Sequence, residues 1–397
     1  MPTEELRQDA ERYLMNTYAR APISVVRGRG SRVYDLEGRE YLDFVAGIAV
    51  NVLGHSHPDL IAAIQKQTQH LLHASNLYLT EPQVRLAQLL VERSFAKKVF
   101  FCNSGAEANE AAIKLARRYA HQKHGPARYE IITMLQSFHG RTMATLSATG
   151  QEKVRKGFEP LVPGFVHVPF NDLPAVEKAL SGATAAVLLE PIQGEGGVHV
   201  AERHYLQGLR DLCRQKDVLL IFDEVQTGMG RTGTLFAYEQ FGMQPDIMTL
   251  AKGLGGGVPI GACLATDEVA AAFTPGSHAS TFGGNPLACS AALAVLRILH
   301  EGKLLAHVRT MGQYLAKGLL DLKERFPNVK EIRGMGLLQG MELSVDGIPV
   351  VTDCLNRGVL INCTMDRVLR FVPPLIIVER DIDRLLDVLS DILTKRL

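Results

Sequence analysis

The chain has 397 residues, of which 46% are hydrophobic and 21% are charged, a composition typical of a folded protein rather than a disordered one. Its 43 Lys and Arg residues balance 42 Asp and Glu residues, so the overall charge predicts neither a nucleic-acid partner nor an anionic membrane surface. The length predicts more than one domain.

The predicted elements begin with short strands at 32–35 and 40–44 around the turn Glu37-Gly38. From about residue 50 to 300, apolar β-branched runs alternate with helical stretches, which predicts a mostly parallel sheet covered by helices on both faces. A helix is predicted at 106–122 because its apolar residues recur at helical spacing. Seven strands are predicted, at 98–102, 130–135, 165–169, 185–190, 218–222, 247–251 and 261–265.

The two ends of the chain differ from this central part. After about residue 305, a helix is followed by extended segments at 332–343, 359–362 and 369–372 and by a closing helix from Asp381. We therefore expect an α/β fold with a large domain at 51–304 and a smaller α+β domain built from both termini, 1–50 and 305–397.

Signals for export or a membrane are not evident. The N-terminus is charged and amphipathic, so no signal peptide is predicted, and the longest apolar run, 45–54, is too short to cross a bilayer. The six cysteines are scattered without a C-x-x-C pair, which indicates thiols in a reducing compartment. A cytoplasmic location is expected.

Three segments at predicted strand ends carry candidate chemistry. Ser104, Gly105 and Ala106 lie where a strand meets a helix, and free N–H groups there can bind an anion, although Ser104 could simply cap the helix. Asp223 follows an apolar strand and could keep a partner nitrogen protonated; a metal ligand or a helix cap is the alternative. Lys252 ends another buried strand, where burial would make its amine a nucleophile, unless it is solvated.

Other motifs are weaker. Phe138 and Arg141 at a further strand end suit a flat ring and a carboxylate. The sequence Gly228-Met229-Gly230-Arg231-Thr232-Gly233 matches a dinucleotide-binding pattern, but the helix and acid that should follow it are missing, so a flexible loop is expected. The His55-x-His57 and His121-x-x-His124 pairs lack nearby acids or cysteines, and no metal site is predicted.

Together these segments offer an anion site for a phosphate, an acid for a ring nitrogen, an aromatic for a ring face and a lysine for an aldehyde. Pyridoxal phosphate (PLP) needs this set. The sequence closely resembles the class III, fold-type I aminotransferases, in the subgroup of acetylornithine, ornithine and 4-aminobutyrate aminotransferases. The resemblance rests on the ordered series NSGAEANEAAIKLAR, SFHGRT, EPIQGEGG, IFDEVQTGMGRTG, AKGLGGGVPIG and HASTFGGNP.

This resemblance implies a role for each candidate residue around the cofactor. Lys252 would bond to the PLP aldehyde, Asp223 would pair with the ring nitrogen and Gln226 would reach the ring hydroxyl. Gly105 and Ala106, after Ser104, would bind the phosphate, and Phe138 would stack on the ring. Thr281 resembles the residue that crosses a homodimer interface to the neighbouring subunit's phosphate, and Ser280 beside it is expected to contact substrate.

The resemblance also implies how substrates are held. Arg141 would contact the carboxylate of the amino donor, Arg370 would hold the α-carboxylate of glutamate, and Glu195 would pair with Arg370 until glutamate binds. The chain looks most like the acetylornithine aminotransferases of arginine biosynthesis, which transfer the terminal amine of N2-acetylornithine to 2-oxoglutarate. Ornithine, succinylornithine, succinyldiaminopimelate and 4-aminobutyrate aminotransferases are the alternatives. An aminomutase or a racemase fits the paired Glu195 and Arg370 less well. A non-enzymatic protein of this fold is disfavoured because Lys252, Asp223 and Arg370 are all present.

Overall fold

The computed structural model describes residues 3–301 and 303–396. Its centre is a seven-stranded sheet with the order β4-β12-β11-β10-β7-β5-β6, in which only β12 runs antiparallel to its neighbours. The expected α/β fold is therefore confirmed. The strands are β4 (Lys98–Cys102), β5 (Glu130–Met134), β6 (Phe165–Val168), β7 (Thr184–Leu189), β10 (Leu219–Asp223), β11 (Ile247–Leu250) and β12 (Gly261–Ala265).

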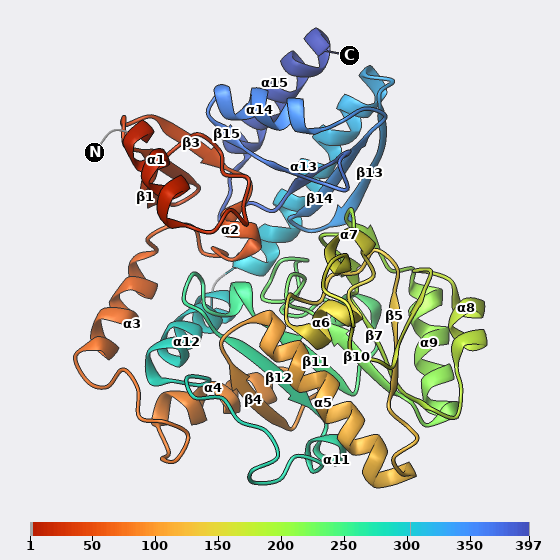
Figure 1. Ribbon diagram of the computed structural model, residues 1–397. Helices are drawn as coiled ribbons and strands as arrows, with labels where there is room; N and C mark the ends of the chain where they lie inside the picture. The colour runs from red at the N-terminus through yellow and green to blue at the C-terminus, as the bar shows by residue number, and fades with distance from the viewer. Residues whose placement is uncertain (1–2, 302, 397) are drawn as a thin grey trace.

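Helices bury both faces of this sheet (Figure 1). In β10, Leu219 and Ile221 join one hydrophobic cluster and Leu220 and Phe222 join the other, as the two-residue repeat of a strand requires. The first cluster contains residues of α5 and α11, and the second contains residues of α9 and α12. These helices are α5 (Gly105–His124), α9 (Arg203–Lys216), α11 (Asp267–Ala270) and α12 (Pro286–Glu301). The central strands β7, β10 and β11 are buried along their whole length and mostly apolar, because neither face meets water.

Shorter helices complete this part of the molecule. They lie along the chain before and between the strands of the large sheet. They are α3 (Pro58–Thr68), α4 (Glu81–Glu92), α6 (Met143–Ala148), α7 (Glu152–Arg155), α8 (Leu173–Ala179) and α10 (Tyr238–Phe241), with the two-stranded pair β8 (Ile192–Gln193) and β9 (His199–Val200) and the short η1 (Lys252–Leu254).

The two ends of the chain lie together in the upper part of Figure 1. One small sheet has the order β1-β2-β3-β15, so that β3 from the N-terminal region pairs in parallel with β15 from the C-terminal region. The hydroxyl of Ser31 donates to Asp381 at 3.0 Å, and Arg32 pairs with the same carboxylate at 2.7 Å. The strands are β1 (Val25–Arg29), β2 (Arg32–Asp35), β3 (Glu40–Asp43) and β15 (Val359–Leu360).

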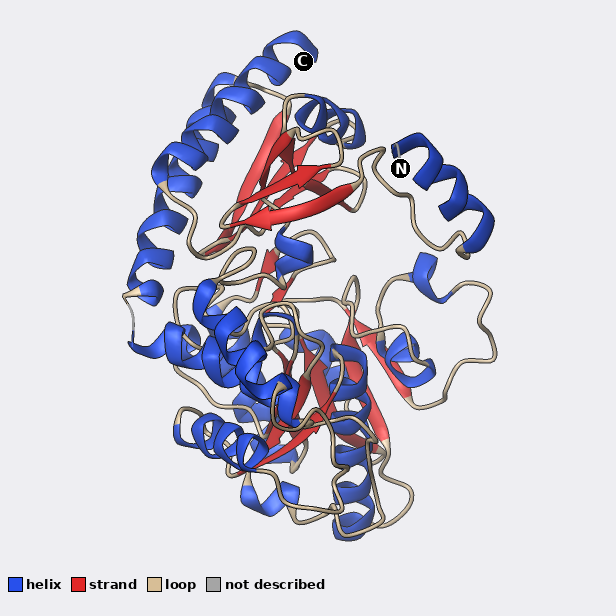
Figure 2. Ribbon diagram, turned by 90° about the vertical axis from the view of Figure 1, so that its left-hand side faces the viewer, coloured by secondary structure: helices blue, strands red, loops and turns tan. Residues whose placement is uncertain are grey.

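A second small sheet, β13-β14-β17-β16, is packed with the C-terminal helices (Figure 2). Its strands are β13 (Val329–Met335), β14 (Leu338–Leu343), β16 (Asn362–Thr364) and β17 (Val368–Phe371), and the remaining helices are α1 (Thr3–Tyr13), α2 (Ala46–Ala49), α13 (Leu304–Arg325), α14 (Ile348–Asn356) and α15 (Glu379–Arg396). We propose that 1–50 and 305–397 form one small domain beside the large domain at 51–304.

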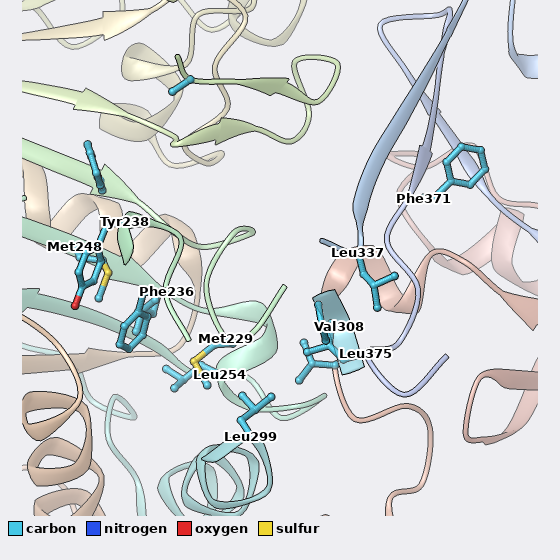
Figure 3. Packing of buried hydrophobic residues seen from close by; sticks show 14 of the residues in the cluster. Met229, Phe236, Tyr238, Met248, Leu254, Leu299, Val308, Leu337, Phe371 and Leu375 are labelled. Carbon is cyan, nitrogen blue, oxygen red and sulfur yellow. The ribbon is translucent and has the colours of Figure 1, made fainter. Parts of the chain in front are cut away.

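Apolar residues join the two regions. Met229, Leu254 and Leu299 belong to the same hydrophobic cluster as Leu337 and Leu375, and Figure 3 shows them along the line between the sheets. This continuous packing holds the small sheets at a defined position above the carboxyl ends of the large sheet's strands. Among the described residues, no helix combines the length and apolar character needed to cross a bilayer.

Candidate active site

A cavity of about 420 Å³ lies where β4, β5, β7, β10 and β11 end, the edge at which open α/β sheets bind ligands. Nine of the twelve residues selected from the sequence line it. They are Ser104, Gly105, Ala106, Phe138, Arg141, Glu195, Asp223, Gln226 and Lys252. Residues separated by up to about 150 positions meet there because parallel strands present their carboxyl ends to the same side.

The N-terminus of α5 forms one wall of this cavity. The Ser104 side chain accepts a hydrogen bond from the Glu107 N–H at 3.2 Å, so the expected alternative of a capping serine is present. In the described part of the chain, the N–H groups of Gly105 and Ala106 have no hydrogen-bond partner and remain available to an anion. A methyl group at Gly105 would lie 2.7 Å from a Val225 methyl carbon. The close packing of the helix start against Val225 therefore requires glycine at position 105.

Lys252 stands at the end of β11 with a left-handed backbone, φ 45°, which costs a non-glycine residue free energy and is tolerated mainly at functional positions. Burial lowers the pKa of its amine, and the neighbouring Arg370 lowers it further, against the opposing effects of Glu195 and Asp223. No hydrogen bond to its amine is found among the described residues. Lys252 lines the cavity, and a buried amine with a lowered pKa is the kind of group that can act as a nucleophile.

Asp223 ends β10 and is 3% exposed. One carboxylate oxygen accepts hydrogen bonds from Asn109 at 2.7 Å and from His139 Nδ1 at 2.8 Å. The other oxygen accepts from the Val225 N–H at 3.0 Å, and Asp223 lines the cavity. The carboxylate is thus fixed and can accept a proton-bearing ring nitrogen.

Glu195, Gln226 and Arg370 form a connected group at another wall. Arg370 Nη1 donates to Glu195 at 2.6 Å and to the Gln226 amide oxygen at 3.1 Å, and the Gln226 amide nitrogen donates to Glu195 at 3.2 Å. Burial alone would raise the pKa of Glu195, but Arg370 and Lys252 hold it below its ordinary value. Arg370 is fully buried behind Glu195, and it does not itself line the cavity.

Two residues of one loop occupy the cavity rim. The Arg141 guanidinium lies 5.7 Å from the centre of the Phe138 ring, and Arg141 is exposed. The Phe138 N–H donates to Glu190 at 3.0 Å. The aromatic face and the cation are therefore presented side by side.

Thr281 and Ser280 lie outside this cavity in the single chain. Thr281 is exposed, whereas the Ser280 hydroxyl accepts hydrogen bonds from Asn103 and from the Gly283 N–H. The predicted contribution of Thr281 to a phosphate requires a second subunit and stays a prediction.

Three cavity residues whose side chains hydrogen-bond to Asp223 or to the Phe138 backbone were not singled out from the sequence. His139 and Glu190 stand inside the motifs SFHGRT and EPIQGEGG, and Asn109 stands on the buried face of α5. Glu190 accepts from the N–H groups of Phe138 and Gly194, and burial raises its pKa to about 7. A polar residue on an apolar helix face was the signal that could have indicated Asn109.

Comparison with known proteins identifies the family. The sequence pattern of the family described as "Aminotransferase class-III" matches residues 13–393. The chain belongs to the class-III aminotransferases. An acetylornithine aminotransferase from Caldanaerobacter subterraneus subsp. tengcongensis is 55% identical to this class-III enzyme over 97% of the chain and 98% of the relative.

Solved structures agree with this assignment. An ornithine aminotransferase from Toxoplasma gondii has a TM-score of 0.95 and 36% identity to this aminotransferase, over 99% of this chain and 94% of that one. An N-acetylornithine aminotransferase from Stenotrophomonas maltophilia has a TM-score of 0.85 and 40% identity, over 98% of both chains.

Class-III aminotransferases use PLP, which is the cofactor of this chain. The cavity fits that group on three observations. The Lys252 amine has no partner among the described side chains, Asp223 presents a fixed carboxylate, and two free N–H groups lie at the start of α5. These are the donor and acceptor types that an aldehyde, a pyridine nitrogen and a phosphate need.

Proposed function

We propose that this aminotransferase transfers the terminal amine of N2-acetylornithine to 2-oxoglutarate, giving N-acetylglutamate semialdehyde and glutamate. Full-length agreement with an acetylornithine aminotransferase, at 55% identity, carries this proposal. The ornithine aminotransferase noted above is similar in fold but only 36% identical. Arginine biosynthesis, in the cytoplasm, is the pathway that such a reaction would serve.

The cavity supports a division of labour around PLP. Lys252 would hold the aldehyde, Asp223 would pair with the ring nitrogen, and Gly105 and Ala106, after Ser104, would hold the phosphate. Phe138 would cover the ring face. Gln226 is expected near the ring hydroxyl, although its amide contacts Glu195 and Arg370 in the structure.

When bound, PLP supplies an electron sink for the negative charge that develops on the substrate carbon. The Lys252 amine would take the proton from that carbon and deliver it to the cofactor carbon that was the aldehyde. The Asp223 carboxylate keeps the ring nitrogen protonated, and its bonds to Asn109 and His139 hold it in place for this purpose.

The pairing of Glu195 with Arg370 suits a reaction with two differently shaped substrates. While the 2.6 Å pair is closed, the arginine charge is neutralised, and a terminal amine with no adjacent carboxylate can enter. When glutamate or 2-oxoglutarate binds, its α-carboxylate would replace Glu195 on the guanidinium. Arg141 would contact the carboxylate of the amino donor.

A homodimer completes the proposal. Apolar side chains that are more than half exposed gather on the segments 72–79 and 282: Leu72 at 52%, Leu77 at 83%, Tyr78 at 68%, Leu79 at 91% and Phe282 at 60%. The two segments are adjacent, since Asn76 donates to the carbonyls of Ser280 and Gly283. An exposed apolar surface of this kind favours a protein interface, and Thr281 lies within it.

The test is glutamate formation from 2-oxoglutarate with N2-acetylornithine, ornithine, succinylornithine and 4-aminobutyrate compared side by side. The highest kcat/KM is expected for N2-acetylornithine. A preference for another donor would overturn the substrate assignment but not the cofactor chemistry. Turnover of the amine without consumption of 2-oxoglutarate would indicate an aminomutase or a racemase instead.

A further inference from the structure

Arg231 lies in the loop at 228–233, whose pattern of glycines is explained neither by a dinucleotide site nor by the proposed chemistry. Its side chain is 0% exposed. No carboxylate of the described residues pairs with it, and its Nε and Nη2 atoms have no hydrogen-bond partner there. Burial lowers its pKa to about 9. An unpaired buried cation lowers the stability of the folded state. The few hydrogen bonds that Arg231 does make therefore indicate why the residue is buried there.

Those contacts join the ends of two neighbouring strands. Arg231 Nη1 donates to the Leu337 carbonyl at 3.0 Å and also to the Pro373 carbonyl. Leu337 directly precedes β14, and Pro373 follows β17 by two residues. The two strands pair antiparallel, and Gly340 stands opposite Arg370. One guanidinium therefore binds the start of β14 and the end of β17, which lie side by side in the antiparallel pair. Arg370 lies on β17.

The backbone of the loop is fixed against the small sheet as well. The Leu337 N–H donates to the Arg231 carbonyl at 3.0 Å. A methyl group at Gly336 would lie 2.6 Å from the Thr232 carbonyl carbon, so the two backbones touch directly. Leu337 and Leu375 pack at this junction (Figure 3).

The residues just before this loop reach the Arg370 side chain. Gln226, five residues before Arg231, accepts from Arg370 Nη1 at 3.1 Å and contacts Glu195. The segment thus contacts the Arg370 side chain at one end and the end of its strand at the other. Both bonds of Arg231 come from the single atom Nη1, so the ammonium of a lysine, on a shorter side chain, would keep at most part of them.

We propose that Arg231 is a positioning residue that fixes β17, and with it Arg370, relative to Glu195 and Gln226 at the cavity. The consequence for function rests on the proposed binding of 2-oxoglutarate by Arg370. Arg231 touches neither substrate nor cofactor, and it acts through the strand.

The experiment compares Arg231→Met and Arg231→Lys with the PLP-loaded wild-type enzyme. Arg309→Met is the matched control, since Arg309 donates to the Gly233 carbonyl of the same loop at 2.6 Å but does not reach the Leu337 or Pro373 carbonyl. Three quantities are measured: KM for 2-oxoglutarate, glutarate binding by titration calorimetry, and amide hydrogen exchange across 368–375.

For Arg231→Met, KM for 2-oxoglutarate and the Kd of glutarate are expected to rise about tenfold or more. This is the effect of a misplaced Arg370 losing one hydrogen bond to the bound carboxylate. The amine-donor half-reaction and the visible cofactor band should stay within about twofold of wild type, which is the scatter of distant substitutions. Exchange across 368–375 should accelerate. Arg231→Lys should give a smaller rise, and Arg309→Met none.

Wild-type KM and exchange in Arg231→Met would overturn the inference. So would an equal loss for both substrates together with loss of the cofactor band, because that indicates general destabilisation. If Arg231→Met does not fold, Arg231→Lys decides, and an unchanged KM and exchange rate refute the role. Arg370→Met separates the two proposals: if it leaves glutarate binding unchanged, the carboxylate role of Arg370 is wrong, while exchange in the Arg231 variants still tests whether Arg231 fixes β17.

Discussion

At the scale of single residues, Lys252 combines three unfavourable conditions. Its backbone is left-handed, its amine is buried, and no described side chain hydrogen-bonds to it. Each condition raises the free energy of the folded chain. A side chain that keeps all three is best explained by covalent chemistry, because bond formation with an aldehyde removes the need for a charged, solvated amine.

We expect Lys252→Ala to lose the visible absorption band of the lysine-linked cofactor and to lower kcat about 10³-fold or more, since it removes both the covalent anchor and a general base. Absorption spectra and glutamate formation measure the two effects. Lys153→Ala, at an exposed position, is the control and should behave as wild type. Substantial turnover by Lys252→Ala would show that another group moves the proton.

The sequence indicated the cavity residues that stand at strand ends within long motifs, such as Asp223 and Lys252. It did not indicate His139, Glu190 and Asn109, because their role depends on which side chains lie behind Asp223 and Phe138 in three dimensions. Hydrogen bonds such as that of Asn109 to Asp223 join residues 114 positions apart, and no local pattern encodes them. The role of Thr281 depends on a surface beyond one chain.

At the scale of elements, the segment after β10 is held by a second buried acid. Glu224 is 1% exposed and accepts hydrogen bonds from the Ala237 and Tyr238 N–H groups at 2.6 and 2.8 Å. It therefore fixes the start of α10 against the strand end that carries Asp223. Burial raises the pKa of Glu224 to about 8.

This pKa predicts a pH dependence of stability. The folded state keeps the Glu224 proton up to about pH 8, whereas the unfolded state releases it near the ordinary value of 4.5. Between these values the folded state binds more protons, so the contribution of Glu224 to stability decreases as pH rises, by at most about 1.4 kcal/mol per pH unit. Glu224→Gln has no such proton to lose.

Urea denaturation of wild type and Glu224→Gln from pH 5 to pH 8 tests this. The free energy of unfolding of the variant should increase relative to that of wild type as pH rises. A fixed difference between the two proteins over the whole range would contradict the assignment. Glu152→Gln, at an exposed glutamate, serves as the control.

The large-sheet strands could be predicted within about one residue because each is a short, mostly apolar run, and the central ones are buried on both faces. The segment 332–343 was harder. It is a hairpin of β13 and β14, with Gly336 at φ 56° in the turn, and neighbouring apolar residues obscured that turn. The extended segment predicted at 359–362 contains β15 and the start of β16. Periodicity alone could not divide it, because β15 pairs with β3 from the N-terminal region and β16 pairs with β17 in the other small sheet.

At the scale of the whole molecule, the exposed apolar segment around Leu77 and Leu79 predicts association. We expect size-exclusion chromatography with light scattering to show a dimer. Leu79→Asp should weaken it, because a charge in an apolar interface is costly, and should lower PLP affinity if Thr281 reaches across. Ile348→Asp is the control, as Ile348 is equally apolar and 53% exposed but lies on α14 (Figure 1). A monomeric, fully active wild type would refute the proposal.

The pairing of β3 with β15, and of Ser31 with Asp381 350 positions later, sets an order of events during synthesis. At roughly 5–20 residues per second, the N-terminal strands wait on the order of 20–70 s before their partners leave the ribosome. The large sheet, formed from residues between these points, can assemble in that interval. The first-made part of the chain is therefore among the last to reach its final structure.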